Sequence, residues 1–277
     1  MKRSRSIARL VDEISALPAD FHAAGVLVPD ALRAIARLAA PMDLAHTAET
    51  GSGKSTLLLS HLSAEHTVFA LDRFGDFDAR SMSAVQESEL FNATNCRFVV
   101  GPTQVTLPRH EFKMPLDLVL IDGPHGYPFP ELEYYYFYPH LRPGALLIVD
   151  DIQIPTIARL FDFLCRDEMY ELVEVAMFTA FFRRTAAPVF NPRADDWWLQ
   201  GFNVHYRDVI RRRALNGHYG WGDPTGHGAA DSAAMTAVPA AAGDKTNWHY
   251  KAYRLARSVA GQRFADRCLA AWRAFRA

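Results

Sequence analysis

The sequence predicts an α/β fold in which a mostly parallel sheet is covered by helices on both faces. Three observations predict it. Short apolar runs alternate with helical patterns through the middle of the chain, as in buried parallel strands joined by crossover helices. A glycine-rich turn joins an extended stretch to a helical one. Two adjacent strand-like runs near residue 180 leave almost no room for a helix, so we expect an antiparallel pair to finish the sheet.

Each element is predicted from its local pattern. Helices are expected where apolar residues recur every three to four positions, and strands where short runs of apolar and β-branched residues occur. In chain order we expect helices over 7–16 and after 28–30, an extended stretch over 42–49, a helix over 54–63, a strand over 66–72, a helix over 82–92, strands over 96–101 and 116–122, a helix near 130–140, a strand over 145–151, a helix over 154–166, and the strand pair 170–178 and 180–185.

The 277 residues are expected to form one domain with extensions. Residues 1–44 are predicted to be a helical N-terminal cap and residues 45–225 the main α/β domain. Residues 226–245 are rich in Ala and Gly and are predicted to be a flexible linker. Residues 246–277 are predicted to form a C-terminal helix, whose apolar stripe suits a homodimer contact.

Composition excludes several classes of partner. The chain has 30 basic and 31 acidic residues, so no global positive field argues for nucleic acid. No apolar run reaches the roughly 18 residues that a membrane span needs. The three cysteines do not make up a disulfide framework, and none is paired at metal-ligand spacing, so we expect them to be reduced thiols. We therefore expect a cytoplasmic protein with no nucleic-acid or membrane partner.

The glycine-rich turn, residues 48–55, has two interpretations. Its sequence A-E-T-G-S-G-K-S fits a relaxed phosphate loop, in which Lys54 would bind phosphate, as in an NTPase or kinase. Against this, Ala48 replaces the first glycine, Glu49 places a carboxylate among the amides that would cradle phosphate, and the preceding stretch is weakly apolar for a buried central strand.

The second interpretation is a nucleoside site. Glu49 then suits a ligand with a cationic end, such as the amino group of S-adenosylmethionine (SAM). Asp72 lies 19 residues after Gly53 and can accept hydrogen bonds from ribose hydroxyls.

Further motifs follow this turn in a fixed order. They are E-T-G-S-G-K-S (49–55), the strand-ending Asp72, F-V-V-G-P-T-Q (98–104), D-L-V-L-I-D-G-P-H-G-Y (117–127) and R-P-G-A-L-L-I-V-D-D-I (142–152). Together they resemble class I SAM-dependent methyltransferases, and the last two are most similar to small-molecule O-methyltransferases of the macrocin and catechol types. The resemblance implies a Rossmann-like, doubly wound, seven-stranded sheet with an antiparallel last strand.

The resemblance also implies an activity, namely methyl transfer to a small-molecule acceptor at a hydroxyl oxygen. In it the methionine end of SAM lies at the glycine-rich turn, the ribose at Asp72, adenine at 101–103 and the methyl group beside Asp122. The implied cofactor-binding residues are Glu49, Gly51, Ser52, Gly53, Ser55, Asp72, Arg73, Gly101, Pro102, Thr103 and Asp122.

The implied catalytic residues are Asp122 and His125. Catechol-type enzymes hold a divalent ion with an aspartate after the fourth strand and a pair after the fifth, which here match Asp122, Asp150 and Asp151. Such oxygen ligands suit Mg²⁺ or another divalent cation. His125 stands where those enzymes carry a lysine base, and a neutral histidine can be a base at pH 7. The aspartates also fit helix or loop caps, and His125 fits a turn. A non-catalytic binding protein on the same fold is the third alternative.

Overall fold

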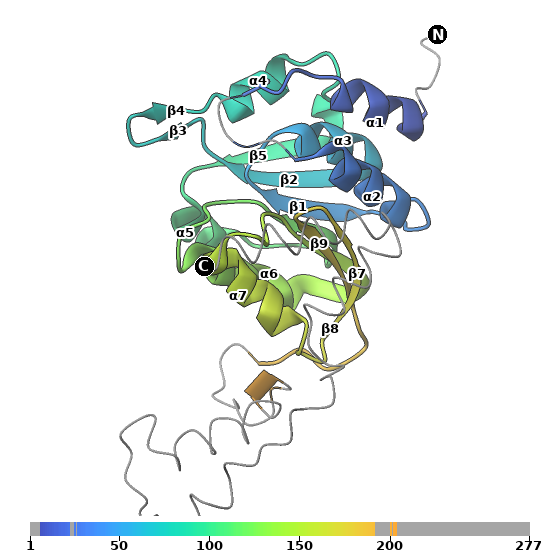
Figure 1. Cartoon of the computed structure of the whole chain (residues 1–277), viewed down its shortest axis with the longest axis vertical. Helices are drawn as coiled ribbons and strands as arrows, with labels where there is room; N and C mark the ends of the chain where they lie inside the picture. The colour runs from blue at the N-terminus through green and yellow to red at the C-terminus, as the bar shows by residue number, and fades with distance from the viewer. Residues whose placement is uncertain (1–5, 23–24, 26, 192–199, 201, 204–277) are drawn as a thin grey trace, which may run out of the picture. The chain divides into compact units, whose positions relative to one another are not determined.

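The computed structural model describes residues 6–22, 25, 27–191, 200 and 202–203 (Figure 1). The chain divides into two units, and the first comprises Met1–Cys165 and Met169–Pro192. The fold and the site lie in this first unit. The predicted linker over 226–245, the C-terminal helix over 246–277 and its homodimer contact lie outside the described residues.

The first unit is built around a seven-stranded sheet in the order β5-β2-β1-β6-β7-β9-β8. Its strands are β1 (His46–Thr50), β2 (Glu65–Ala70), β5 (Cys96–Val100), β6 (Leu116–Ile121), β7 (Leu141–Val149), β8 (Tyr170–Ala176) and β9 (Thr179–Arg184). The pairs from β5 to β7 are parallel, and β9 runs antiparallel to both β7 and β8. The predicted doubly wound fold is confirmed. The strand order reverses between β1 and β6, which is where open α/β sheets bind ligands.

Helices cover the sheet on both faces, as predicted. They are α1 (Ile7–Ser15), α2 (Pro29–Ala39), α3 (Lys54–Leu62), α4 (Ser81–Glu87), α5 (Thr103–Thr106), α6 (Phe129–Phe137) and α7 (Pro155–Leu164), with single 3₁₀ turns at Ala93–Asn95, Leu107–Arg109 and Tyr138–His140. A small hairpin of β3 (Arg73–Phe74) and β4 (Phe77–Asp78) was not predicted. Within the described residues, no helix is both long enough and apolar enough to cross a membrane.

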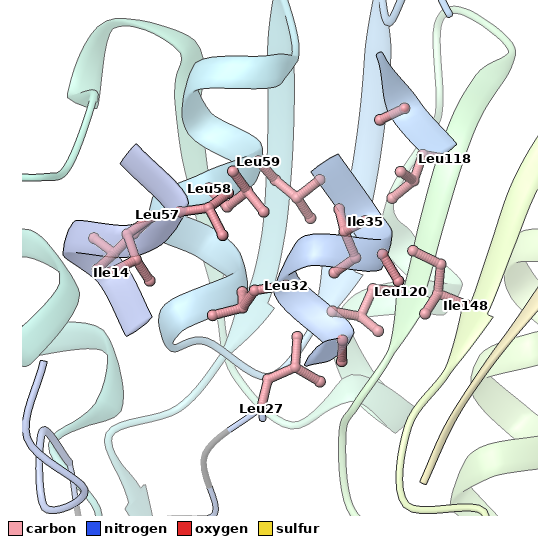
Figure 2. Close-up of a cluster of buried hydrophobic side chains, with 14 of the residues drawn as sticks. Ile14, Leu27, Leu32, Ile35, Leu57, Leu58, Leu59, Leu118, Leu120 and Ile148 are labelled. Atoms are coloured by element: carbon pink, nitrogen blue, oxygen red, sulfur yellow. The ribbon is translucent and has the colours of Figure 1, made fainter. Parts of the chain in front are cut away.

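The helical N-terminal cap packs on α3. α1 begins at Ser6, whose hydroxyl accepts a hydrogen bond from the amide of Arg9, and α2 begins with Pro29, which suits a first helical position. Their buried leucines and isoleucines meet those of α3 and the sheet, as Figure 2 shows for Ile14, Leu32, Ile35, Leu57 and Leu120 among others. This apolar cluster fixes the helix that follows the glycine-rich turn.

The central strand β1 is polar yet completely buried. All five of its residues, H-T-A-E-T, are buried. Thr47 Oγ1 lies 2.8 Å from His66 Nδ1, and His46 Nε2 lies 3.3 Å from Thr67 Oγ1. The weak apolarity of this stretch, which in the sequence argues against a phosphate loop, does not prevent it from forming a buried central strand, because its side chains are paired with those of β2.

Candidate functional site

The glycine-rich turn is packed tightly between two neighbours. Gly51 has φ +82°, and a Cβ atom there would lie 2.3 Å from the carbonyl oxygen of Asp122. A Cβ atom at Gly53 would lie 2.7 Å from Nε2 of His22. The backbone of the turn therefore approaches the β6 loop on one side and the N-terminal segment on the other. Only glycine allows both the left-handed backbone and the close approach at Gly51.

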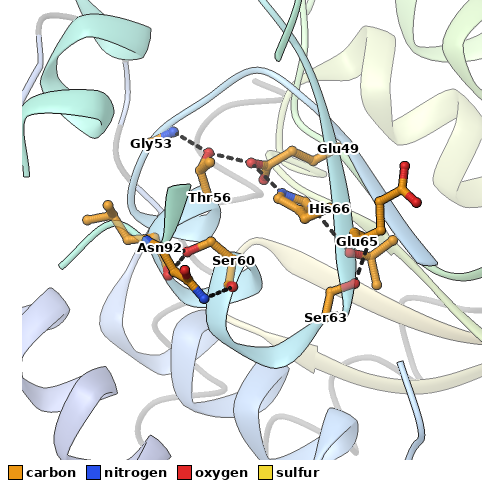
Figure 3. A network of polar contacts seen from close by, with 10 residues as sticks. Glu49, Gly53, Thr56, Ser60, Ser63, Glu65, His66 and Asn92 are labelled. Atoms are coloured by element: carbon orange, nitrogen blue, oxygen red, sulfur yellow. Dashed lines mark hydrogen bonds and ion pairs between the residues drawn. The ribbon is translucent and has the colours of Figure 1, made fainter. Parts of the chain in front are cut away.

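A chain of hydrogen bonds connects Glu49 to the glycine-rich turn (Figure 3). Its carboxylate accepts a hydrogen bond from the hydroxyl of Thr56 and lies 3.1 Å from Nε2 of His66. Thr56 Oγ1 in turn accepts a hydrogen bond of 3.0 Å from the amide of Gly53. Glu49 is fully buried, so in this structure it acts on the turn through Thr56. Its direct contact with a cationic ligand stays a prediction.

Two buried oxygens at the turn have no hydrogen-bond partner among the residues that the structure describes. They are Oε2 of Glu49 and Oγ of Ser52. Buried polar atoms are normally paired, so atoms of this kind mark places where a ligand or water completes the structure. Both belong to the residues predicted to bind the cofactor.

The contacts of Lys54 do not support a phosphate-binding role. Its Nζ donates a hydrogen bond of 2.8 Å to the carbonyl oxygen of Leu17. Burial lowers the pKa of this amine. Ser55, beside it in the first turn of α3, is also buried. Lys54 therefore attaches the N-terminal segment to α3.

Asp72 caps α4. Its Oδ1 accepts hydrogen bonds from the amides of Met82 (2.7 Å) and Ser83 (3.1 Å), and its Oδ2 accepts one from the Ser83 hydroxyl (2.5 Å). A carboxylate has about four acceptor positions, so one remains for a ribose hydroxyl. Arg73 is exposed and lies 3.4 Å from Asp78 within the β3–β4 hairpin. The cofactor roles of Asp72 and Arg73 stay predictions.

The predicted adenine segment follows β5. Gly101 has φ +144° and its amide donates to the carbonyl of Ala70, so the segment is joined to the end of β2. Pro102 precedes α5, and Thr103 is buried in its first turn. An open hollow is lined by Gly101 and Pro102 together with Val99, Val100, Val105, Thr106, Arg109 and His110. No residue of the glycine-rich turn lines this hollow, so it is not the predicted cofactor cleft.

Three titratable side chains meet where β6 and β7 end. His125 Nε2 lies 3.4 Å from Oδ2 of Asp151 and 3.9 Å from Oδ1 of Asp122. One ligand-type atom from each of the three lies within 4.8 Å of the others. The hydroxyl of Thr156, in α7, donates to the carbonyl oxygen of His125 and so holds its loop.

The predicted metal triad differs from this arrangement. Asp122 and Asp151 are brought together as predicted, but His125 takes the third place. The carboxylate of Asp150 instead accepts a hydrogen bond from the hydroxyl of Thr179, on the neighbouring strand β9. Asp150 and Asp151 thus point to different partners, since Asp151 adopts a left-handed backbone with φ +55°.

These groups shift one another's pKa values. Contact with Asp122, and the charges of Asp151 and Asp150, raise the pKa of His125 against the opposing effect of burial. Burial, reinforced by Asp150 and Asp151 and opposed by His125, raises the pKa of Asp122. Burial also raises the pKa of Asp150 to about 6. Groups that titrate near neutral pH at a sheet's ligand-binding edge are typical of catalytic sites.

Sequence reasoning missed Thr50 and Glu133. Thr50 Oγ1 donates to Oε2 of Glu133 over 2.7 Å and accepts a hydrogen bond of 3.1 Å from the amide of Asp122. Glu133 is fully buried in α6, and burial raises its pKa to about 7 against the opposing effect of the Thr50 hydroxyl. One signal was available: Glu133 lies four residues before Phe137, on the face of the helix that turns toward the core.

Residues 48–152 match the model of a family described as a methyltransferase domain. A comparison with curated protein sequences gave no match. Among solved structures, the chain is similar to the Streptomyces achromogenes O-methyltransferase TomG, involved in tomaymycin synthesis and solved with SAM (18% identity, 67% of this chain and 92% of that chain, TM-score 0.45). It is also similar to a Klebsiella pneumoniae protein proposed to be an O-methyltransferase (15% identity, 65% and 90%, TM-score 0.46). A Staphylococcus aureus protein proposed to be a caffeoyl-CoA O-methyltransferase is likewise similar (14% identity, 66% and 93%, TM-score 0.46).

Structural neighbours this distant carry no argument about activity. The family match spans the strands from β1 to β7, including the glycine-rich turn and the segment that contains Asp122 and His125. The strand order and the antiparallel β9 agree with the fold that the resemblance implied. The chain therefore contains a segment, residues 48–152, that is similar to a methyltransferase domain.

Proposed function

We propose that this enzyme transfers the methyl group of SAM to a hydroxyl oxygen of a small-molecule acceptor. The observation that carries this proposal is the placement of His125. Its imidazole is 42% exposed and lies beside two carboxylates at the carboxyl edge of the sheet. The Asp122 backbone, in contact with Gly51, joins this group to the glycine-rich turn. A proton acceptor therefore stands next to the cofactor segment.

The residues of the turn fit SAM. Glu49 and Ser52 offer the buried oxygens without partners among the described residues, and Gly51 lets the turn pack closely against the backbone of Asp122. We assign the methionine end of SAM to this turn, the ribose to Asp72 and adenine to 101–103. The whole proposed set is Glu49, Gly51, Ser52, Gly53, Ser55, Asp72, Arg73, Gly101, Pro102, Thr103 and Asp122.

The chemistry divides between cofactor and protein. SAM supplies an activated methyl carbon, which the acceptor oxygen displaces in line from sulfur. The protein must align the acceptor and remove its proton. We assign the proton to Nε2 of His125. The carboxylates of Asp122 and Asp151 would stabilise the imidazolium that results.

Binding a divalent cation is the other role that this group of side chains fits. Asp122, His125 and Asp151 could each give one ligand atom, and a bound cation would lower the pKa of the acceptor hydroxyl. A histidine ligand beside two carboxylates suits Mn²⁺ better than Mg²⁺. The same Nε2 cannot both bind a cation and accept a proton, so the two roles of His125 exclude each other.

Calorimetric titration with SAM, S-adenosylhomocysteine (SAH), Mg-ATP and Mn²⁺ tests the proposal. We expect micromolar binding of SAM and SAH and no response to Mg-ATP. Lys54→Ala should leave SAH affinity unchanged, because Lys54 binds the backbone of Leu17. ATP binding that is lost in Lys54→Ala would instead support the NTPase or kinase alternative. SAH binding without turnover of any acceptor would point to a non-catalytic relative.

Asp72→Ala separates the two uses of that carboxylate. We expect SAH affinity to fall about tenfold, because a hydrogen bond to the ribose is lost. The free energy of unfolding should fall by about 1 kcal/mol, because α4 loses its cap. Ser83→Ala is the matched control: it removes one hydrogen bond to Asp72 but keeps the carboxylate. Calorimetry and urea denaturation of both variants give the two quantities, and normal affinity in Asp72→Ala contradicts the ribose assignment.

A further inference from the structure

A buried junction joins the ends of β1 and β6 to α6. It consists of Thr50, Gly51, Asp122, Gly123 and Glu133. Thr50 and Gly51 end β1 and begin the glycine-rich turn, while Asp122 and Gly123 follow β6. Glu133 comes from α6, and its side chain is fully buried. None of the proposed catalytic steps uses Thr50, Gly123 or Glu133.

The hydroxyl of Thr50 is the centre of the junction. It accepts the amide hydrogen of Asp122 at 3.1 Å and donates its own hydrogen to Glu133 at 2.7 Å. A hydroxyl that donates to a fixed acceptor has its lone pairs oriented for the incoming amide. Glu133 therefore sets the direction in which Thr50 receives the backbone of Asp122.

Two close contacts complete the junction. A Cβ atom at Gly123 would lie 2.2 Å from Oε1 of Glu133, so the carboxyl group fills the space beneath that residue. The φ angle of Gly123 lies outside the left-handed region, so space and not backbone conformation requires glycine there. On the other side, the carbonyl of Asp122 fills the space at Gly51. A displacement of Asp122 would therefore also displace the glycine-rich turn.

We propose that Glu133 is a positioning residue of the methyl-transfer site, which acts through Thr50 to hold Asp122 against the glycine-rich turn. This inference rests on the proposed use of that turn for SAM. Glu133 touches neither cofactor nor acceptor in this role. Its effect on SAM is transmitted by the hydrogen bonds of Thr50 and by the contact between Asp122 and Gly51.

The test compares SAH affinity and thermal stability in matched variants of the full chain. Thr50→Val removes both hydrogen bonds at nearly constant volume, and Glu133→Ala removes the acceptor. We expect each to weaken SAH binding about tenfold. Thr50→Ser and Glu133→Gln keep a hydroxyl and an acceptor oxygen and should restore most of the affinity. Thr67→Val is the control, since Thr67 is a buried strand threonine whose hydroxyl lies 3.3 Å from His46; its affinity should be that of the wild type.

The outcomes separate this proposal from the proposed function. Wild-type affinity in folded Thr50→Val overturns the role of Glu133, even if the melting temperature falls. An equal loss of affinity in Thr67→Val also overturns it, because affinity would then follow stability alone. If Glu133→Ala does not fold, the comparison of Thr50→Val with Thr50→Ser still decides. A wild-type protein that binds neither SAM nor SAH overturns both proposals, whereas wild-type binding with all variants unchanged overturns only this one.

Discussion

Gly51→Ala should abolish SAM binding and destabilise the protein. Gly51 has a left-handed φ of +82°, and the new methyl group would lie 2.3 Å from the backbone oxygen of Asp122. No rotamer change relieves this clash, because both partners are backbone or attached directly to it. We expect the free energy of unfolding to fall by about 2–4 kcal/mol. SAH affinity should fall by more than about 100-fold, because the turn and Asp122 must separate.

Gly75→Ala is the matched control for this variant. Gly75 also has a positive φ, +60°, but no atom lies within 4 Å of the position of its added Cβ. Its free energy of unfolding should fall by only about 1 kcal/mol, because alanine is strained in a left-handed backbone, and its SAH affinity should be unchanged. Urea denaturation and calorimetry on both variants distinguish strain from steric clash. Normal SAH binding in Gly51→Ala would contradict the assignment of this turn to the cofactor.

His125→Asn should reduce methyl transfer by about 10²–10⁴-fold in kcat with little effect on SAM affinity. Asparagine preserves most of the volume and polarity but cannot accept a proton. His140→Asn is the control, because His140 follows α6 near the opposite end of β7 and lies beside Phe112. SAH formation, measured with a panel of hydroxylated acceptors, gives kcat. A full rate in His125→Asn would exclude both a base and a ligand role.

The pH dependence of the same reaction tests the base assignment. A base works only when neutral, so the rate should rise as pH increases through the pKa of His125. Asp122 raises that pKa above the ordinary 6.5, so the rising limb should lie above pH 6.5. Asp122→Asn removes the main cause of the shift and should move the limb to lower pH. A limb that stays in place in Asp122→Asn would argue against His125 as the titrating group.

Much of the fold was predictable because its signals are local. The strands β2, β6 and β9 are apolar runs, and the helices α1 and α3 show helical spacing or follow a glycine-rich turn. The β3–β4 hairpin was missed because its strands contain two residues each, too few for a pattern. The stretch expected over 42–49 overlaps β1 only at 46–49, and the burial of β1 could not be foreseen, since the partners of His46 and Thr47 lie on another strand.

The site was predictable in part, for a related reason. Asp122, His125 and Asp151 lie at predicted strand ends, and parallel strands bring such ends together. The separation of Asp150 from Asp151 depends on Thr179, which only the antiparallel β9 places beside Asp150. Glu133 was not predicted, because it lies among the aromatic residues of α6 and its role depends on Thr50, 83 residues earlier in the chain. Contacts of that range leave no signal in a local pattern.

The polar side chains of β1 also bear on how the sheet is aligned during folding. An apolar central strand can slide along its neighbours with little loss, because one methyl-rich surface replaces another. If β1 slipped by one residue against β2, every side chain would turn to the opposite face. Thr47 would lose His66, and His46 would lose Thr67. Each buried group left unpaired costs about 1–3 kcal/mol. The strand least like a typical core strand therefore makes its own misalignment unfavourable.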